Sequence, residues 1–149
     1  MKPYLTLREE IESVQQYLDR ESAESDRKLT REFFLDPEVD TDTVIPRNLL
    51  QVFVENSLRN GLSNGNSETN IQISINRSDP GILVMVADSG PRKGSVSPFG
   101  TEQSEGLKIL NSYLPVFNRQ QQVTISYKML NLNHENGSPG SRVIITIKN

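Results

Sequence analysis

The segment "IPRNLLQVFVENSLRNG", residues 45–61, is the most informative part of the sequence for the fold. Its apolar residues recur every three or four positions, which predicts an amphipathic helix with one side on a core. Pro46 suits the first turn of this helix and Gly61 is a natural stop. The opposite side carries one carboxylate and two carboxamides, Glu55, Asn56 and Asn60. A ligand-binding helix needs such groups, whereas a solvated helix tolerates them.

Around this helix the periodicity alternates between helix and strand. Upstream, residues 6–26 predict a helix opened by a Thr6–Glu9 capping box, followed by a strand at 28–36 and a turn-rich connector at 37–46. Downstream, the pattern predicts strands around 71–75 and 82–88, a helix at 107–117, and strands at 122–130 and 141–149. This order predicts an α/β (α+β) two-layer sandwich, in which helices cover one face of a mixed, mostly antiparallel sheet.

The amino-acid composition argues against several classes of function. The 149 residues predict a single domain, and the net charge of −3 gives no reason to expect binding to nucleic acid. The sequence has no cysteine and a single histidine, His134, which argues against thiolate or histidine metal sites and a serine–histidine triad. No apolar run approaches the ~20 residues of a membrane span.

Four stretches could carry chemistry, and each also has a purely structural explanation. Asn56 and Asn60 share one helix face, and amide oxygens suit Mg²⁺; a solvated flank would look the same. Asp88 and Gly90 end an apolar strand, where an acid could accept a hydrogen bond from an amine, or the residues could simply form a turn. Gly106 opens a helix whose N–H groups suit phosphate. Ser141 opens the last strand and is the weakest signal.

The order and spacing of these stretches resemble the ATP-binding superfamily that gyrase, a heat-shock chaperone, mismatch-repair proteins and histidine kinases share (GHKL, Bergerat-type fold). Within it, residues 45–61 resemble the N box of LytS-like sensor histidine kinases, typically IPPLLLQPLVENAIKHG. Residues 6–29 are similar to the helix-to-strand lead-in of that family. The resemblance covers nearly the whole chain.

The resemblance implies a role for each matching residue. Asn56 would be the Mg²⁺ ligand, with Arg59 and Asn60 near the phosphates. Asp88 would receive the adenine amino group and Gly90 would lie against the ring, while Ser141 would replace the threonine that assists the aspartate. The remaining matches are Gly106 and Leu107 near the phosphates, Gly94 as the later glycine of the loop, and Glu55 as the acid before the asparagine. Glu55 would polarise the attacking group, or it would only pair with Arg59.

Two family motifs are altered. The usual DNGxG becomes "DSGPRKG", which places Gly94 two positions late, and GxGL becomes "SEGL", with Ser104 in place of the first glycine. Glu105 would then stand near the phosphates, where a carboxylate costs ~1 kcal/mol or more unless it points away or is screened. These departures leave weak nucleotide affinity or loss of catalysis open as an alternative.

The resemblance implies a protein histidine kinase domain that binds ATP and Mg²⁺ under a lid at about 89–105. No "PHFLFN"-like phosphoacceptor sequence is present, and His134 falls in a polar hairpin. The chain is therefore expected to be part of a longer protein, inactive without a phosphoacceptor segment from the same or a partner subunit. The whole protein would be a membrane-anchored homodimer that serves a response regulator, with this part in the cytoplasm. Two alternatives stay open: a degenerate interaction or scaffold domain, and an anti-sigma-factor-type serine kinase.

Overall fold

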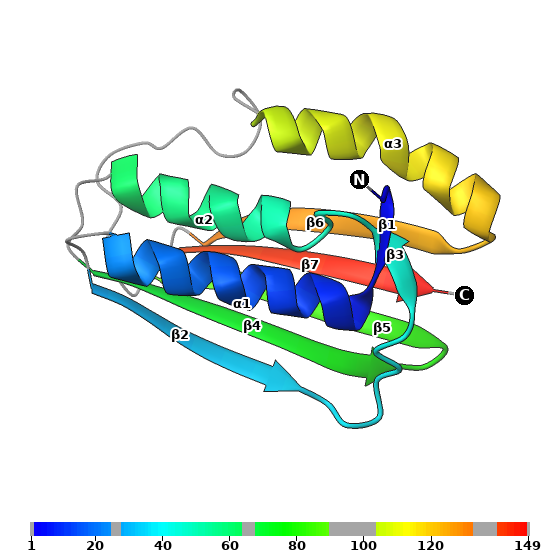
Figure 1. Cartoon of the computed structure of the whole chain (residues 1–149), viewed down its shortest axis with the longest axis horizontal. Helices are drawn as coiled ribbons and strands as arrows, with labels where there is room; N and C mark the ends of the chain where they lie inside the picture. Colours follow the sequence, from blue (N-terminus) through cyan, green and yellow to red (C-terminus); the bar gives the residue numbers. More distant parts are fainter. Residues whose placement is uncertain (1, 25–27, 64–67, 90–103, 133–139, 149) are drawn as a thin grey trace.

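The computed structural model describes residues 2–24, 28–63, 68–89, 104–132 and 140–148. Three helices form one layer over one face of a sheet (Figure 1). The elements in chain order are β1 (Tyr4–Thr6), α1 (Leu7–Glu24), β2 (Lys28–Leu35), β3 (Val44–Pro46), α2 (Gln51–Ser63), β4 (Glu68–Ser78), β5 (Gly81–Ser89), α3 (Glu105–Gln121), β6 (Thr124–Leu132) and β7 (Gly140–Lys148). The predicted two-layer fold is confirmed.

The main sheet has the strand order β2-β4-β5-β7-β6. β2 pairs with β4 in parallel, and the other neighbours are antiparallel, so the sheet is mixed as predicted. The apolar strand β5 lies at the centre. Alternate residues of the strands face the helices, because the side-chain period of a strand is two, and on β4 these are the buried Ile71, Ile73 and Ile75.

The core lies between the helices and this face of the sheet. The largest fully buried side chains include Phe53 of α2, Phe117 of α3 and Leu18 of α1, so each helix contributes to one shared core. Phe53 and Tyr127 of β6 pack with ring centroids 4.9 Å apart. The apolar stripe predicted for residues 45–61 therefore faces the core.

A second, two-stranded sheet was not predicted. β1 pairs antiparallel with β3, and Tyr4 lies opposite Pro46. Pro46 therefore ends a strand, and the prediction that it occupies the first turn of the helix is wrong. α2 begins only at Gln51, after a turn in which Asn48 adopts a left-handed φ of 71°, a conformation that asparagine tolerates well.

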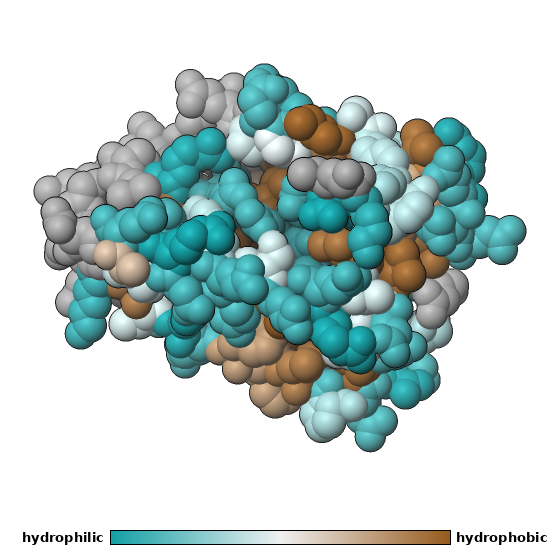
Figure 2. All heavy atoms as spheres, in the orientation of Figure 1, coloured by the Kyte–Doolittle hydropathy of each residue, from teal (hydrophilic) through white to brown (hydrophobic). Residues whose placement is uncertain are grey.

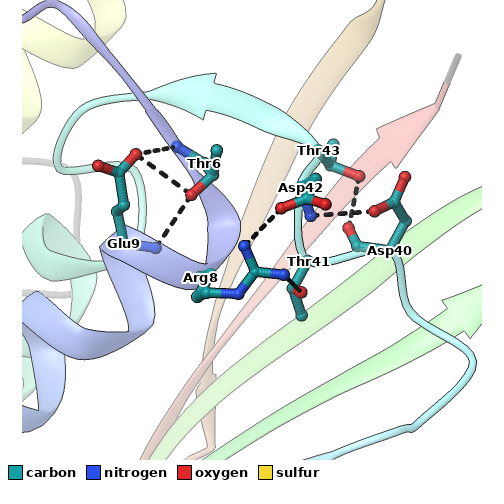
Figure 3. Close-up of polar contacts among 7 residues, drawn as sticks. All are labelled: Thr6, Arg8, Glu9, Asp40, Thr41, Asp42 and Thr43. Carbon is teal, nitrogen blue, oxygen red and sulfur yellow. Dashed lines mark hydrogen bonds and ion pairs between the residues drawn. The ribbon is translucent and has the colours of Figure 1, made fainter.

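Two sets of polar interactions stabilise the start of α1 (Figure 3). Thr6 and Glu9 form the predicted capping box: the Thr6 N–H donates to Glu9 Oε1 at 2.9 Å and the Glu9 N–H donates to Thr6 Oγ1 at 3.2 Å. The Arg8 guanidinium reaches the segment before β3, where it pairs with Asp42 and donates to Thr41 Oγ1 at 2.8 Å. Helix α1 is thus attached to the segment that leads into α2.

A buried carboxylate fixes the start of α2. Glu10 of α1 has no exposed surface, and its two oxygens accept hydrogen bonds from the backbone N–H groups of Asn48, Leu50 and Gln51, each at 3.1 Å. These N–H groups lie at a helix N-terminus, where no intrahelical partner exists. Glu10 therefore caps a neighbouring helix, which no local pattern in the sequence indicates.

The surface over the helix layer is mostly hydrophilic, with smaller apolar areas over β2 and α3 (Figure 2). The large apolar side chains that are exposed on these two elements are Phe33 and Phe34 of β2, and Ile109 of α3. Among the helices that the structure describes, none combines the length and apolar character needed to cross a membrane.

Candidate nucleotide site

Asp88 lies at the end of the central strand β5, on the side that faces the helices. The same side of β5 carries the buried Val84 and Val86, so a carboxylate replaces an aliphatic side chain at the strand end. Asp88 is only 8% exposed. A buried carboxylate needs hydrogen-bond partners because burying an unpaired charge is costly, and one partner is the hydroxyl of Ser141.

Ser141 of β7 lies directly opposite Asp88 in the antiparallel ladder. Its Oγ–H donates to Asp88 Oδ2, and the serine is 1% exposed. A third buried polar residue, Thr69 of β4, belongs to the same end of the sheet, since its neighbour Asn70 pairs with Ser89. The otherwise apolar inner face of the sheet is therefore polar at this end.

Asn56 lies on the flank of α2 that faces α3. Val52, one turn earlier on the same flank, is close to Gly106: a Cβ on Gly106 would lie 3.2 Å from Val52 Cγ2. Asn56 is half-buried, and its Oδ1 accepts a hydrogen bond of 2.6 Å from Arg59 Nη2. The amide oxygen thus already faces a positive charge.

The first turn of α3 is built around Ser104. Its Oγ accepts a hydrogen bond of 3.1 Å from the N–H of Leu107, which makes Ser104 the N-cap. Leu107 is buried in the core, whereas Glu105 is exposed and lies 3.5 Å from Lys108 Nζ. The Glu105 carboxylate is therefore exposed to solvent beside a cation. A carboxylate that is screened in this way would repel a nearby phosphate less strongly.

Gly106 permits close packing of α3 on α2. We expect Gly106→Val to lower the free energy of unfolding by about 1–3 kcal/mol, because even a Cβ atom would be in tight contact with Val52 and overpacking costs this much. Thermal unfolding checks this. Ser112→Val, on an exposed position of the same helix, is the control and is expected to change stability little; equal losses in both variants would refute the packing role.

Glu55 lies on the other side of α2, toward α1. Its Oε2 accepts a hydrogen bond of 2.9 Å from Gln51 Nε2, while the guanidinium of Arg59 bonds to Asn56. The alternative that Glu55 only pairs with Arg59 is therefore not what the structure shows. Burial, with smaller contributions from Glu21 and Glu55, raises the pKa of Tyr17 in α1 to about 12, which places Glu55 near that ring.

Several predicted positions fall outside the described residues. These are Gly90, Gly94, His134, nearly all of the lid predicted at about 89–105, and the side chain of Asn60 in α2. The described residues contain no group of three or more histidine, cysteine, aspartate or glutamate side chains suited to a metal ion. The structure does bring together Asp88 with Ser141, and Asn56 with Arg59, and it places the flank of Asn56 beside the start of α3.

Solved structures of other proteins share the fold of this chain. No family model matches the chain, and no curated protein matches it either. Solved structures do match: the catalytic domain of histidine kinase ThkA has a TM-score of 0.56 at 21% identity, covering 99% of this chain and 97% of that one. Acinetobacter baumannii histidine kinase AdeS gives 0.59 at 18% identity over 97% of this chain and 66% of that one. Mycobacterial sensor histidine kinase MprB gives 0.52 at 13%, covering 97% and 98%. The chain therefore shares its fold with histidine kinase catalytic domains.

Proposed function

We propose that this domain binds Mg-ATP and acts as the catalytic ATP-binding domain of a LytS-like sensor histidine kinase. The observation that carries the proposal is the buried Asp88–Ser141 pair at the end of the central strand, on the side of the helix layer. The likeness of the fold to histidine kinase catalytic domains and the N-box motif at residues 45–61 support it.

Asp88 would bind the purine. A carboxylate with little exposed surface accepts a hydrogen bond from an exocyclic amine strongly, because bonds to charged acceptors exceed neutral ones. The Ser141 hydroxyl holds one carboxylate oxygen and so orients the group. Gly90, two residues further on, would let the ring approach the backbone.

The phosphate end would lie between Asn56 and the start of α3. Asn56 Oδ1 fits a cation ligand, since the Arg59 guanidinium already lies against it, and Mg²⁺ is usually held by few protein groups plus phosphate oxygens. Arg59 would then turn to the phosphates, together with Asn60. At the helix N-terminus the Leu107 N–H is already used by Ser104, so the N–H groups of the preceding residues, including Gly106, would meet the phosphate.

In phosphoryl transfer the protein mainly positions the reactants and neutralises charge. The γ-phosphate would pass to a histidine on an upstream segment of the same or a partner subunit. Glu55, on the α1 side of α2, is proposed to polarise that acceptor. The complete protein would be a membrane-anchored homodimer with this domain in the cytoplasm and a response regulator as its partner.

Magnesium dependence tests the proposal. We expect an unhydrolysable ATP analogue to bind the wild type more tightly with Mg²⁺ than with a chelator, as measured by isothermal titration calorimetry. Asn56→Ala should remove this difference, because the amide oxygen supplies the proposed Mg²⁺ ligand. Asn76→Ala on β4 is the control, since this asparagine pairs with Leu83 far from the Asp88 end.

Two other results would replace the proposal. Absence of binding at millimolar nucleotide would favour a degenerate interaction or scaffold domain. Binding followed by phosphorylation of a serine on a partner protein, with no histidine involved, would favour an anti-sigma-factor-type kinase.

The exposed Glu105 and its Lys108 neighbour leave the altered "SEGL" motif compatible with an anion nearby.

A further inference from the structure

The face of the sheet away from the helices contains a hollow of about 470 Å³. It lies over β2, β4 and β5, whereas the three helices all lie on the other face (Figure 1). Pockets that hold small molecules have volumes of roughly 300–1,000 Å³. The hollow is thus large enough for a ligand, and it lies on the opposite side of the sheet from the Asp88 side chain.

The sequence creates this hollow by placing small residues beside large ones. Phe34, Ser74 and Met85 form one cross-strand row, and Ala87 lies in the next row opposite Gln72. Ser74 stands between Phe34 and Met85 in its row. Because the side chains of Ser74 and Ala87 are small, they leave space beside the larger Phe34 and Met85 side chains. The Phe34 ring lines the hollow and is 53% exposed, so a ligand in the hollow would cover part of it.

Among the described residues that line the hollow, one carries a charge. This is Glu32 of β2, whose Oε2 accepts a hydrogen bond of 2.9 Å from Gln72 Nε2. The bond holds the carboxylate against β4, in a lining whose other residues are uncharged. A carboxylate fixed in this way attracts a cation and repels an anion.

We infer that the hollow binds a small molecule with an aromatic or branched apolar body and a protonated amine. The body fills the space between Phe34 and Met85, and the ammonium group pairs with Glu32 and lies near the phenyl ring, which attracts cations. Neither interaction involves a residue of the proposed nucleotide site.

Methyl NMR of the methionines tests this inference with 2-phenylethylamine as the probe. Met85 lies in the hollow, whereas Met129 pairs with Val143, whose side chain is buried on the helix side of the sheet. We expect the Met85 methyl signal to shift in a saturable way and the Met129 signal to stay. 3-Phenylpropionate, which carries the opposite charge on a similar body, should bind about tenfold more weakly or not at all, as loss of a hydrogen bond to a charged group implies.

Two variants sharpen the test. Glu32→Gln should weaken binding of the amine about tenfold and remove the preference over the acid. Ala87→Leu should fill the hollow and abolish binding, with circular dichroism checking that the fold persists. Glu12→Gln, an exposed position on α1, is the matched control and should bind as the wild type does.

Three outcomes would overturn the inference: no shift of Met85, parallel shifts of Met85 and Met129, or equal binding of the amine and the acid. The first two would show that no site exists, and the third would show that the carboxylate does not select the ligand. Titration with an ATP analogue examines the other face separately, so the two proposals can fail independently.

Discussion

Asp88→Asn is expected to weaken binding of an ATP analogue by about tenfold to a hundredfold. The asparagine keeps the shape of the side chain and can still accept the Ser141 hydroxyl through one oxygen. The second carboxylate oxygen is replaced by an amide NH2 group, however. This group is a donor and would face the N–H donor of the purine amine. Loss of a hydrogen bond to a charged group costs about 1.5–3 kcal/mol, which corresponds to this range of affinity.

Calorimetry with matched variants decides the matter. Asp42→Asn, at an exposed carboxylate in the segment before β3, should bind the nucleotide as the wild type does. Ser141→Ala should produce a smaller loss than Asp88→Asn, since it removes only the group that orients the carboxylate. If the heat of binding survives Asp88→Asn unchanged, the nucleotide does not bind at this strand end.

Glu10→Ala should lower the free energy of unfolding by about 3 kcal/mol. The substitution leaves three backbone N–H groups at the start of α2 without their acceptor, and one unsatisfied buried group costs about 1–3 kcal/mol. Water and local rearrangement recover part of this sum. Urea unfolding followed by circular dichroism measures the change, and Glu12→Ala on the exposed side of α1 should change stability by less than about 0.5 kcal/mol.

The pH dependence of this capping interaction has a defined sign. Burial raises the pKa of Glu10 above its ordinary value of 4.5, and the hydrogen bonds from Gln51, Asn48 and Leu50 only partly oppose the rise. The folded state therefore binds the proton more tightly than the unfolded state, so the stability contributed by Glu10 is greatest below pH 4.5 and falls as the pH rises through the folded pKa.

Glu10→Gln does not titrate and serves as the reference for this effect. The free energy of unfolding of the wild type relative to Glu10→Gln should decline as the pH rises from about 4.5 through the raised pKa of Glu10. A difference that grows over this interval would mean that the three N–H groups outweigh burial and that the pKa is lowered instead.

The long elements could be predicted from the sequence because each carries its own periodic signal. The stripe of α2 and the alternation of Ile71, Ile73 and Ile75 on β4 are local patterns that burial then confirms. β1 and β3 have three residues each, too few to show a period, and their pairing joins Tyr4 to Pro46 across the chain. Only tertiary contact identifies such strands, which explains the wrong placement of Pro46.

The residues of the candidate site also differ in whether the sequence alone reveals their roles. Asp88 and Asn56 could be selected because a carboxylate at a strand end and an amide in the "VENS" motif are visible in the sequence. The capping role of Glu10 could not, since its acceptor oxygens serve backbone groups of residues about forty positions later. The role of Ser104 as N-cap was also missed, although a serine just before a helical pattern is a recognised start signal.

The short sheet of β1 and β3 determines where an attachment to the chain's first residues would act. Tyr4 packs against Phe117 with ring centroids 5.6 Å apart, and its hydroxyl donates to Gln120 Oε1 at 3.2 Å, so residue 4 rests on the C-terminal half of α3. Asp88 is the second-last residue of β5, and this end of the strand lies toward the other end of the helix layer (Figure 1). A dye, tag or surface tether joined at the amino terminus would therefore attach at the end of the helix layer that is remote from Asp88.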